Sequence, residues 1–164
     1  MAAVSTDEQP PGAETPLTLY LVKRLELAIR ALMDDALREL GLTTLQYTAL
    51  TVLQTSGPLT SAQLARRSFL RPQTMHEMVL TLERRGLIVR EVKEGNKRAM
   101  LASLTGGGAE LLARCAPAVL ELEGALLDEI GPGRRAAFRK SLQHGISALA
   151  TLSETRRTET DTRR

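Results

Sequence analysis

Four polar side chains that could bind a ligand lie close together just after Pro72 in this 164-residue chain. They are an amide, a hydroxyl, an imidazole and a carboxylate, carried by Gln73, Thr74, His76 and Glu77. Glutamine can pair bidentately with adenine, threonine can contact a phosphate or a thymine methyl, and glutamate can accept a hydrogen bond from cytosine. This set predicts recognition of base edges in double-stranded DNA. Two alternatives stay open: His76 as a solvated surface residue, and Glu77 paired with a neighbouring arginine without touching a base.

Groups suited to phosphate binding lie on both sides of this run. Ser61 stands at the start of an expected short helix, where its hydroxyl and the helix N–H groups can donate to a phosphate. Arg71 precedes Pro72 and is well placed to contact a second phosphate. Lys97 would add a nonspecific phosphate contact. Residues 42–104 hold nine Lys and Arg against four Glu, a surplus of five, although the whole chain carries only +3. A basic middle segment favours an anionic partner.

Catalysis, cofactor binding and metal binding are disfavoured by the residues present. An enzyme needs a nucleophile with a base, a metal cluster or a glycine-rich phosphate cradle. Residues 106–108 are three glycines after an expected strand, but they lack the spacing of a dinucleotide fingerprint and the Lys-Ser/Thr pair of a P-loop. The two His and one Cys do not have metal-ligand spacing, and aromatics amount to 2%, too few for base-stacking platforms. We expect no catalytic residue, no cofactor and no metal.

The polar groups must be held by helices, which the apolar periodicity predicts along most of the chain. After a capping pair at 15–16, apolar residues recur at the 3.6-residue period up to Gly41. Thr43 and Thr60 each open a capping box, in which a threonine is followed three residues later by a glutamine. Pro72 then begins a fourth helix at its first turn. The two closely spaced helices that begin near Thr60 and Pro72 predict a helix-turn-helix.

The apolar period then changes from 3.6 to about 2. Residues 87–93 and 98–104 predict two strands around a turn at 94–97. A hairpin of this kind after two closely spaced helices is typical of a wing. Thr105 can cap a fifth helix, and the Gly-Pro-Gly break at 131–133 precedes a last helix.

The long first helix and the last two helices have apolar faces that the compact middle unit cannot cover. Pairing with a second chain would remove those faces from water, so we expect a twofold homodimer. The expected fold class is mainly α with a small β-hairpin wing, a winged helix-turn-helix flanked by N- and C-terminal dimerisation helices. The expected divisions are a disordered arm (1–15), a dimerisation helix (16–41), the DNA-binding unit (42–104), two dimerisation helices (105–152) and a polar tail (153–164).

Four segments carry a resemblance to a known family. They are LTTLQYTAL (42–50), LTSAQLA (59–65), LERRGLIVR (82–90), and Asn96-Lys97-Arg98 followed by Leu104, Thr105 and Gly108. In order and spacing they resemble the second helix, the third helix, the passage into the wing, and the wing itself of the MarR (multiple antibiotic resistance regulator) family. The resemblance extends over residues 17–152 and implies a winged helix-turn-helix transcriptional regulator.

This resemblance also implies how such a protein would act. It implies a repressor that binds a near-palindromic operator as a homodimer and is released by a small-molecule ligand. It places Arg98 in the minor groove as the main contact of the wing. The family commonly has an acid two residues before this arginine. Asn96 stands there instead, and it can hold the guanidinium by one hydrogen bond but supplies no charge, so a looser wing is expected.

The resemblance further implies a ligand cleft where the dimerisation helices meet the DNA-binding unit. The residues expected to line it are Arg30, Met33, Leu37, Tyr47, Leu112 and Cys115. One phenol and one cation in apolar surroundings would suit a small aromatic or phenolic acid. Simple core packing is the alternative for the apolar members. Because its neighbours in sequence are apolar, Cys115 is expected to be a buried, inert thiol rather than an oxidation switch.

Two other functions stay open. A MarR-fold interaction protein that no longer binds DNA would be consistent with Glu77 and Asn96. A ligand-unresponsive architectural DNA binder would be expected to carry more charge than +3. No stretch approaches the roughly 18 apolar residues of a membrane span, and the N-terminus lacks the features of a signal peptide. We therefore expect a cytoplasmic protein with no membrane partner.

Overall fold

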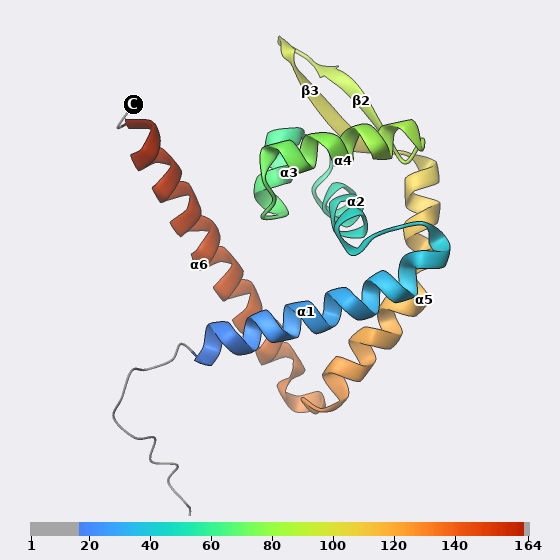
Figure 1. The fold of residues 1–164 in the computed structure, drawn as a ribbon, viewed down its shortest axis with the longest axis vertical. Coiled ribbons are helices and arrows are strands. Elements are labelled where there is room, and N and C mark those ends of the chain that lie inside the picture. The colour runs from blue at the N-terminus through green and yellow to red at the C-terminus, as the bar shows by residue number, and fades with distance from the viewer. Residues whose placement is uncertain (1–16, 163–164) are drawn as a thin grey trace, which may run out of the picture.

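The computed structural model describes residues 17–162 as a helical protein with one small antiparallel sheet (Figure 1). Its elements are α1 (Leu17–Leu37), η1 (Arg38–Leu40), α2 (Thr44–Ser56), β1 (Leu59–Thr60), α3 (Ser61–Arg67), α4 (Pro72–Arg84), β2 (Ile88–Lys93), β3 (Asn96–Leu104), α5 (Gly106–Asp128), η2 (Pro132–Arg134) and α6 (Arg135–Thr162). The mainly helical fold class with a hairpin is confirmed. The expected arm at 1–15 and the capping pair at 15–16 lie outside the described residues.

The beginnings of α2 and α3 are fixed by capping boxes, as the sequence predicts. The Thr43 hydroxyl accepts a hydrogen bond from the Gln46 backbone N–H (3.2 Å), and the Gln46 amide oxygen accepts from the Thr43 N–H (3.2 Å). Thr60 and Gln63 repeat the arrangement at α3, with distances of 3.2 and 2.9 Å. Each box satisfies two N–H groups that a helix start would otherwise leave without partners.

The sheet has three strands in the order β1-β3-β2. β2 and β3 form the expected hairpin, although β3 begins at Asn96, so the connecting turn is only residues 94–95. Gly95 has a left-handed φ of 79°, which suits a tight hairpin turn. The third strand, β1, was not predicted: it is two residues long and pairs Leu59 with Ala102. This pairing joins the start of the helix-turn-helix to the wing.

Thr105 joins the end of α4 to the start of α5. Its hydroxyl accepts from the Gly108 N–H (3.1 Å), which confirms the predicted cap, and it donates to the Gly86 carbonyl (2.7 Å). A side chain at Gly108 would bring its Cβ within 2.2 Å of the Leu87 carbonyl oxygen. Gly108 in the first turn of α5 therefore permits a close approach to the chain that leaves α4, which offsets its poor helix propensity.

One hydrophobic core lies between α2, α3, α4 and the sheet. Its fully buried side chains include Leu50, Leu64, Val79 and Leu82. Leu37 of α1 and Cys115 of α5 reach the same core and are also fully buried. The flanking helices are therefore attached to the winged unit through the end of α1 and the first half of α5, which contains Pro117.

Beyond these attachments, α1 and α6 extend away from the core. In Figure 1, α6 extends away from the winged unit, and α1 crosses the molecule below that unit towards α5. Leu17, Leu21 and Leu32 of α1 are exposed, as are four apolar side chains of α6: Leu142, Ile146, Leu149 and Leu152. Within residues 17–162, no helix combines the length and the hydrophobicity that crossing a bilayer requires.

The last helix runs further than its polar sequence predicts. A polar tail was expected from residue 153, whereas α6 continues to Thr162. Threonine hydroxyls of this segment donate back to carbonyls one turn earlier, Thr155 to Thr151 (3.1 Å) and Thr160 to Arg156 (2.9 Å). These bonds satisfy the hydroxyls within the helix, although bonding to the carbonyl four residues earlier adds little to helix stability.

Candidate nucleic-acid interface and apolar cavity

α3 and α4 form a helix-turn-helix around buried apolar side chains. Leu64 and Ala65 of α3 and Met75 of α4 belong to the same core cluster. The turn is closed by the Leu70 N–H, which donates to the Ala65 carbonyl (2.9 Å), and Phe69 within it has a left-handed φ of 53°. This geometry sets the angle at which α4 leaves α3.

The start of α4 is exposed and lacks a capping acceptor. Arg71 occupies the N-cap with Pro72 at the first helical position, and a guanidinium cannot accept a hydrogen bond from the first turn. The first-turn N–H groups and the exposed Arg71 side chain therefore remain available to an anion. At the start of α3, Ser61 is half-buried, and its helix is capped by Thr60.

The predicted base-reading residues lie together on the outer face of α4. Gln73, Thr74, His76 and Glu77 are exposed, whereas Met75 of the same helix is buried. The Gln73 side-chain amide donates to a Glu77 carboxylate oxygen (2.9 Å), one helical turn away. Glu77 is thus paired with a glutamine rather than with the neighbouring arginine considered from the sequence. The amide nitrogen has two N–H donors, so Gln73 can keep this bond through one of them while the other N–H and the amide oxygen pair with adenine.

The wing carries an exposed arginine in its second strand, close to the hairpin turn. Arg98 is exposed on β3, next to Lys97. The Asn96 side-chain oxygen accepts a hydrogen bond from the Arg98 backbone N–H (3.1 Å). Asn96 therefore fixes the start of β3, rather than holding the Arg98 guanidinium as the sequence suggested it could.

Several cations counted in the basic middle segment have structural partners. Arg90 of β2 donates twice to one Glu83 oxygen of α4, at 2.9 and 2.6 Å, and these bonds lower the pKa of the Glu83 carboxyl. Arg85 donates to the Gly41 carbonyl (2.7 Å), which ties the end of α4 to the segment before α2. Sequence reasoning missed the Arg90–Glu83 pair, which fixes the hairpin on α4. The charge surplus in the sequence therefore overstates the number of cations free to meet DNA.

A polar link joins α1 to α2. Asp34 accepts hydrogen bonds from both the backbone N–H and the hydroxyl of Thr44, each at 2.7 Å. These bonds lower the pKa of the Asp34 carboxyl, the backbone N–H contributing most. The link lies between a flanking helix and the DNA-binding unit.

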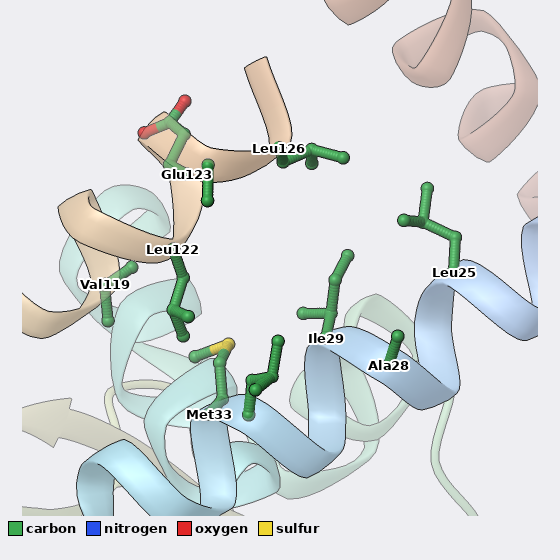
Figure 2. Close-up of a pocket in the computed structure, with 10 residues that line it drawn as sticks. Leu25, Ala28, Ile29, Met33, Val119, Leu122, Glu123 and Leu126 are labelled. Carbon is green, nitrogen blue, oxygen red and sulfur yellow. The ribbon is translucent and has the colours of Figure 1, made fainter. Parts of the chain in front are cut away.

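An apolar cavity of about 310 Å³ lies between α1 and α5 (Figure 2). Its lining consists of Leu25, Ala28, Ile29, Leu32, Met33, Val119, Leu122, Glu123, Ala125 and Leu126. All of these belong to α1 or α5, and in Figure 2 the side chains of Leu25, Ile29 and Met33 face those of α5. The volume is at the lower end of the range typical of ligand pockets.

Of the residues expected in a ligand cleft, only Met33 lines this cavity. Leu37, Leu112 and Cys115 are buried in the core, and Tyr47 is half-buried against it. Arg30 is exposed and forms an ion pair with Glu26. Burial raises the pKa of the Cys115 thiol, which keeps it protonated and unreactive. The helical spacing of apolar residues in α1 and α5 indicated which faces of these helices are apolar. It did not indicate which of these residues line a cavity, because that depends on the angle between the two helices.

Metal binding has no support in the described part of the chain. Across residues 17–162, no group of three His, Cys, Asp or Glu side chains comes together in a way that could hold a metal ion.

Comparison with known proteins finds one family repeatedly. A sequence model described as the MarR family matches residues 40–99, the span from the end of η1 to the wing. An HTH-type transcriptional repressor of Mycobacterium tuberculosis is 30% identical over 124 residues, which cover 76% of this chain and 89% of that protein.

Solved structures agree with this match. A MarR family protein of Mycobacterium tuberculosis in complex with p-aminosalicylic acid is 29% identical, with a TM-score of 0.65 over 79% of this chain and 98% of that chain. A MarR family transcriptional regulator from a Rhodococcus species is 22% identical, with a TM-score of 0.73 over 82% of this chain and 96% of that one. At that identity the second likeness concerns the fold.

Proposed function

The chain belongs to the MarR family of winged helix-turn-helix transcriptional regulators, and from this premise we propose that it is a homodimeric repressor that binds a near-palindromic operator in double-stranded DNA. The observation that carries the proposal is the exposed polar face of α4 beside a hairpin with an exposed arginine. In helix-turn-helix proteins, the second helix enters the major groove with its N-terminal residues nearest the bases. By analogy, α4 is proposed to enter the major groove, and the family resemblance supports a contact of Arg98 with the minor groove.

We assign a proposed DNA contact to each candidate residue from its place in the fold. Gln73, Thr74, His76 and Glu77 are proposed to face base edges, because they lie on the first two turns of α4 away from the core. The proposed phosphate contacts are Ser61, Arg71 and Lys97, at the start of α3, the start of α4 and the wing. Phosphate contacts hold the register of the protein on DNA, whereas base contacts supply its specificity.

The homodimer is proposed from the exposed apolar faces of the flanking helices. Leu21 and Leu32 of α1 are 51% and 54% exposed, and Ile146 and Leu149 of α6 are 55% and 54% exposed. Contiguous exposed leucines are uncommon on a monomer, and a twofold partner would remove them from water. The two copies of α4 would then meet half-sites about one helical turn apart.

Control by a small molecule completes the proposal. The structure of the Mycobacterium tuberculosis relative was solved with p-aminosalicylic acid, and this chain has an apolar cavity between α1 and α5. A ligand that changed the packing of α1 against α5 would alter the spacing of the two copies of α4 and release the operator. Because the relatives are named as transcriptional repressors, we propose no catalytic role, and a regulator of chromosomal genes would act in the cytoplasm.

Selection of bound DNA from a random pool by the purified protein tests the proposal. Recovery of one inverted repeat is expected. Binding should also weaken steeply with salt, because a dimer that neutralises roughly 6–10 phosphates releases a similar number of counterions. Binding without sequence enrichment would favour an architectural DNA binder instead. Absence of binding even at low salt would favour an interaction protein of the same fold.

A further inference from the structure

One pair of charged side chains joins α4 to the wing. Glu83 lies in the last turn of α4, and Arg90 is the third residue of β2. We propose that this pair is a positioning device: it sets the place of Arg98 relative to α4, so that the helix and the wing can contact DNA at the same time. The DNA part of this inference rests on the proposed function, whereas the position of the wing does not.

The pair fixes both the distance and the orientation of its partners. The Arg90 Nε and one Nη donate to the same Glu83 oxygen, at 2.9 and 2.6 Å. A planar guanidinium that donates from two nitrogens cannot turn about one bond without losing the other. The Arg90 and Glu83 side chains are 19% and 33% exposed, so their neighbours restrict them further. Among residues 17–162, every hydrogen bond between α4 and the hairpin runs between these two residues.

The part of the hairpin that carries Arg98 projects beyond the sheet. β1 pairs with β3 only at Leu101 and Ala102. Ala102 is also the register partner of Arg90, and Arg98 lies four residues further along β3, about 13 Å away at ~3.3 Å per residue. A tilt of the hairpin by about 10° at Arg90 would therefore move Arg98 by about 2 Å. Such a shift breaks a hydrogen bond to DNA, because donor–acceptor distances vary by only about half an ångström.

The same geometry separates this role from a direct contact with DNA. Arg90 uses two of its nitrogens on Glu83, so it is not a free cation of the basic middle segment. Glu83 lies about 9 Å along α4 from Glu77, the nearest of the proposed base-reading residues. The base of the hairpin is held in the core by Ile88 and Ala102, which are 2% and 1% exposed. Loss of the pair would therefore loosen the wing without unfolding the sheet.

Charge and position predict opposite signs for one substitution, which provides the test. Glu83→Ala removes a negative charge from the DNA-binding unit and frees the Arg90 guanidinium, so charge alone would strengthen DNA binding. Because the wing loses its link to α4, we expect affinity to fall by about three- to tenfold instead. Glu91→Ala removes an equal charge from an exposed position next to Arg90 and should raise affinity about two- to fivefold. Fluorescence anisotropy with a labelled duplex carrying the inverted repeat recovered by selection measures both.

Two further variants separate positioning from a general loss of structure. Arg90→Lys keeps the charge but not the paired donors, so affinity should fall although the net charge is unchanged. In an Arg98→Ala background, Glu83→Ala should cause no further loss, because a wing without Arg98 has no such contact left to misplace. A merely structural role would lower affinity equally in both backgrounds. Circular dichroism and the melting temperature check the fold of each variant.

A measurement without DNA tests the position of the wing itself. Spin labels on Gln73→Cys and Glu94→Cys, both exposed positions, report the distance from the start of α4 to the hairpin turn. The native Cys115 is buried, so the labels attach to the introduced cysteines. Dilution with unlabelled protein leaves only distances within one chain. We expect one narrow distance distribution with the native pair and a broader or shifted one with Glu83→Ala.

Three outcomes would overturn the inference. They are DNA affinity that rises alike in Glu83→Ala and Glu91→Ala, equal losses from Glu83→Ala with and without Arg98, and an unchanged distance distribution. A wild-type protein that selects no DNA contradicts the proposed function, and the spin labels then still decide whether the pair fixes the wing. A protein that selects an inverted repeat but gives any of the three outcomes contradicts only this inference.

Discussion

Leucines in the core of the winged helix-turn-helix unit are buried, whereas the leucines of α6 are exposed. Leu50, Leu64 and Leu82 of the unit are 0% exposed, whereas Leu149 of α6 is 54% exposed. The unit is held by its own capping boxes, its three-stranded sheet and one closed core. The flanking helices meet that core through the last turns of α1 and through α5 as far as Leu122. The difference supports the proposed homodimer, in which a second chain would cover the exposed faces of the flanking helices.

The largest expected effect compares one leucine from each region. Leu64→Ala should lower the free energy of unfolding by about 2–5 kcal/mol, because it leaves a cavity in a closed core. Leu149→Ala should change the unfolding of dilute monomer little and raise the dissociation constant of the dimer. Urea unfolding and sedimentation, each at several protein concentrations, measure the two quantities.

The comparison would break if the two variants behaved alike. A large loss of monomer stability in Leu149→Ala would mean that α6 packs within its own chain. An unchanged dimer would mean that the exposed stripe of α6 is not the interface.

The wing gives the next effect, in DNA affinity rather than stability. Arg98→Ala should weaken binding by about 1–3 kcal/mol, because the exposed guanidinium is proposed to enter the minor groove. Arg134→Ala removes an equal charge from η2, between the flanking helices, and should have little effect. Fluorescence anisotropy with labelled operator measures both, and equal losses would show that only net charge matters.

A smaller effect, an increase in DNA affinity, is expected from a substitution on α4. Glu77→Gln keeps an acceptor for the Gln73 amide (2.9 Å in the wild type) and removes a negative charge from the proposed groove face. Affinity should rise about two- to fivefold for all sequences, since repulsion from phosphates is relieved. Glu110→Gln on α5 is the matched control. A loss confined to the operator would instead assign Glu77 to a cytosine contact.

The smallest effect concerns the link between the two regions. The folded-state pKa of Asp34 lies below its usual value of 3.8, so ionised Asp34 stabilises the fold above that pH. This contribution disappears as the pH falls through the lowered pKa. Asp34→Asn should therefore destabilise the protein at about pH 6, and the difference from wild type should shrink towards about pH 3. A difference independent of pH would show that shape, and not charge, makes the link with Thr44.

Local signals in the sequence predicted much of the winged unit. The Thr43–Gln46 and Thr60–Gln63 boxes and the Thr105 cap depend on residues three apart, so a reader of the sequence can find them. β1 could not be found this way, because two residues become a strand only by pairing with β3.

The cavity was misplaced for a related reason. The sequence identified the apolar stripes of α1 and α5, but the packing angle decides that Met33 faces the hollow while Leu37 and Cys115 enter the core. The length of α6 was underestimated because its last turns are polar, and a polar composition by itself does not distinguish a solvated helix from an irregular tail. Roles in DNA binding for the residues of α4 and the wing remain predictions for the experiments above.

The double hydrogen bond of the Thr105 hydroxyl restricts how the protein can move. It connects the Gly86 carbonyl after α4 to the Gly108 N–H in the first turn of α5, so those two segments cannot rotate relative to each other without losing a bond. α4 and the beginning of α5 therefore form one rigid body. The next soft point along α5 is Pro117, which has no N–H to donate and so removes one bond from the helix. A bend at Pro117 would therefore break no helical hydrogen bond at that residue and would change the direction of the second half of α5 relative to α4.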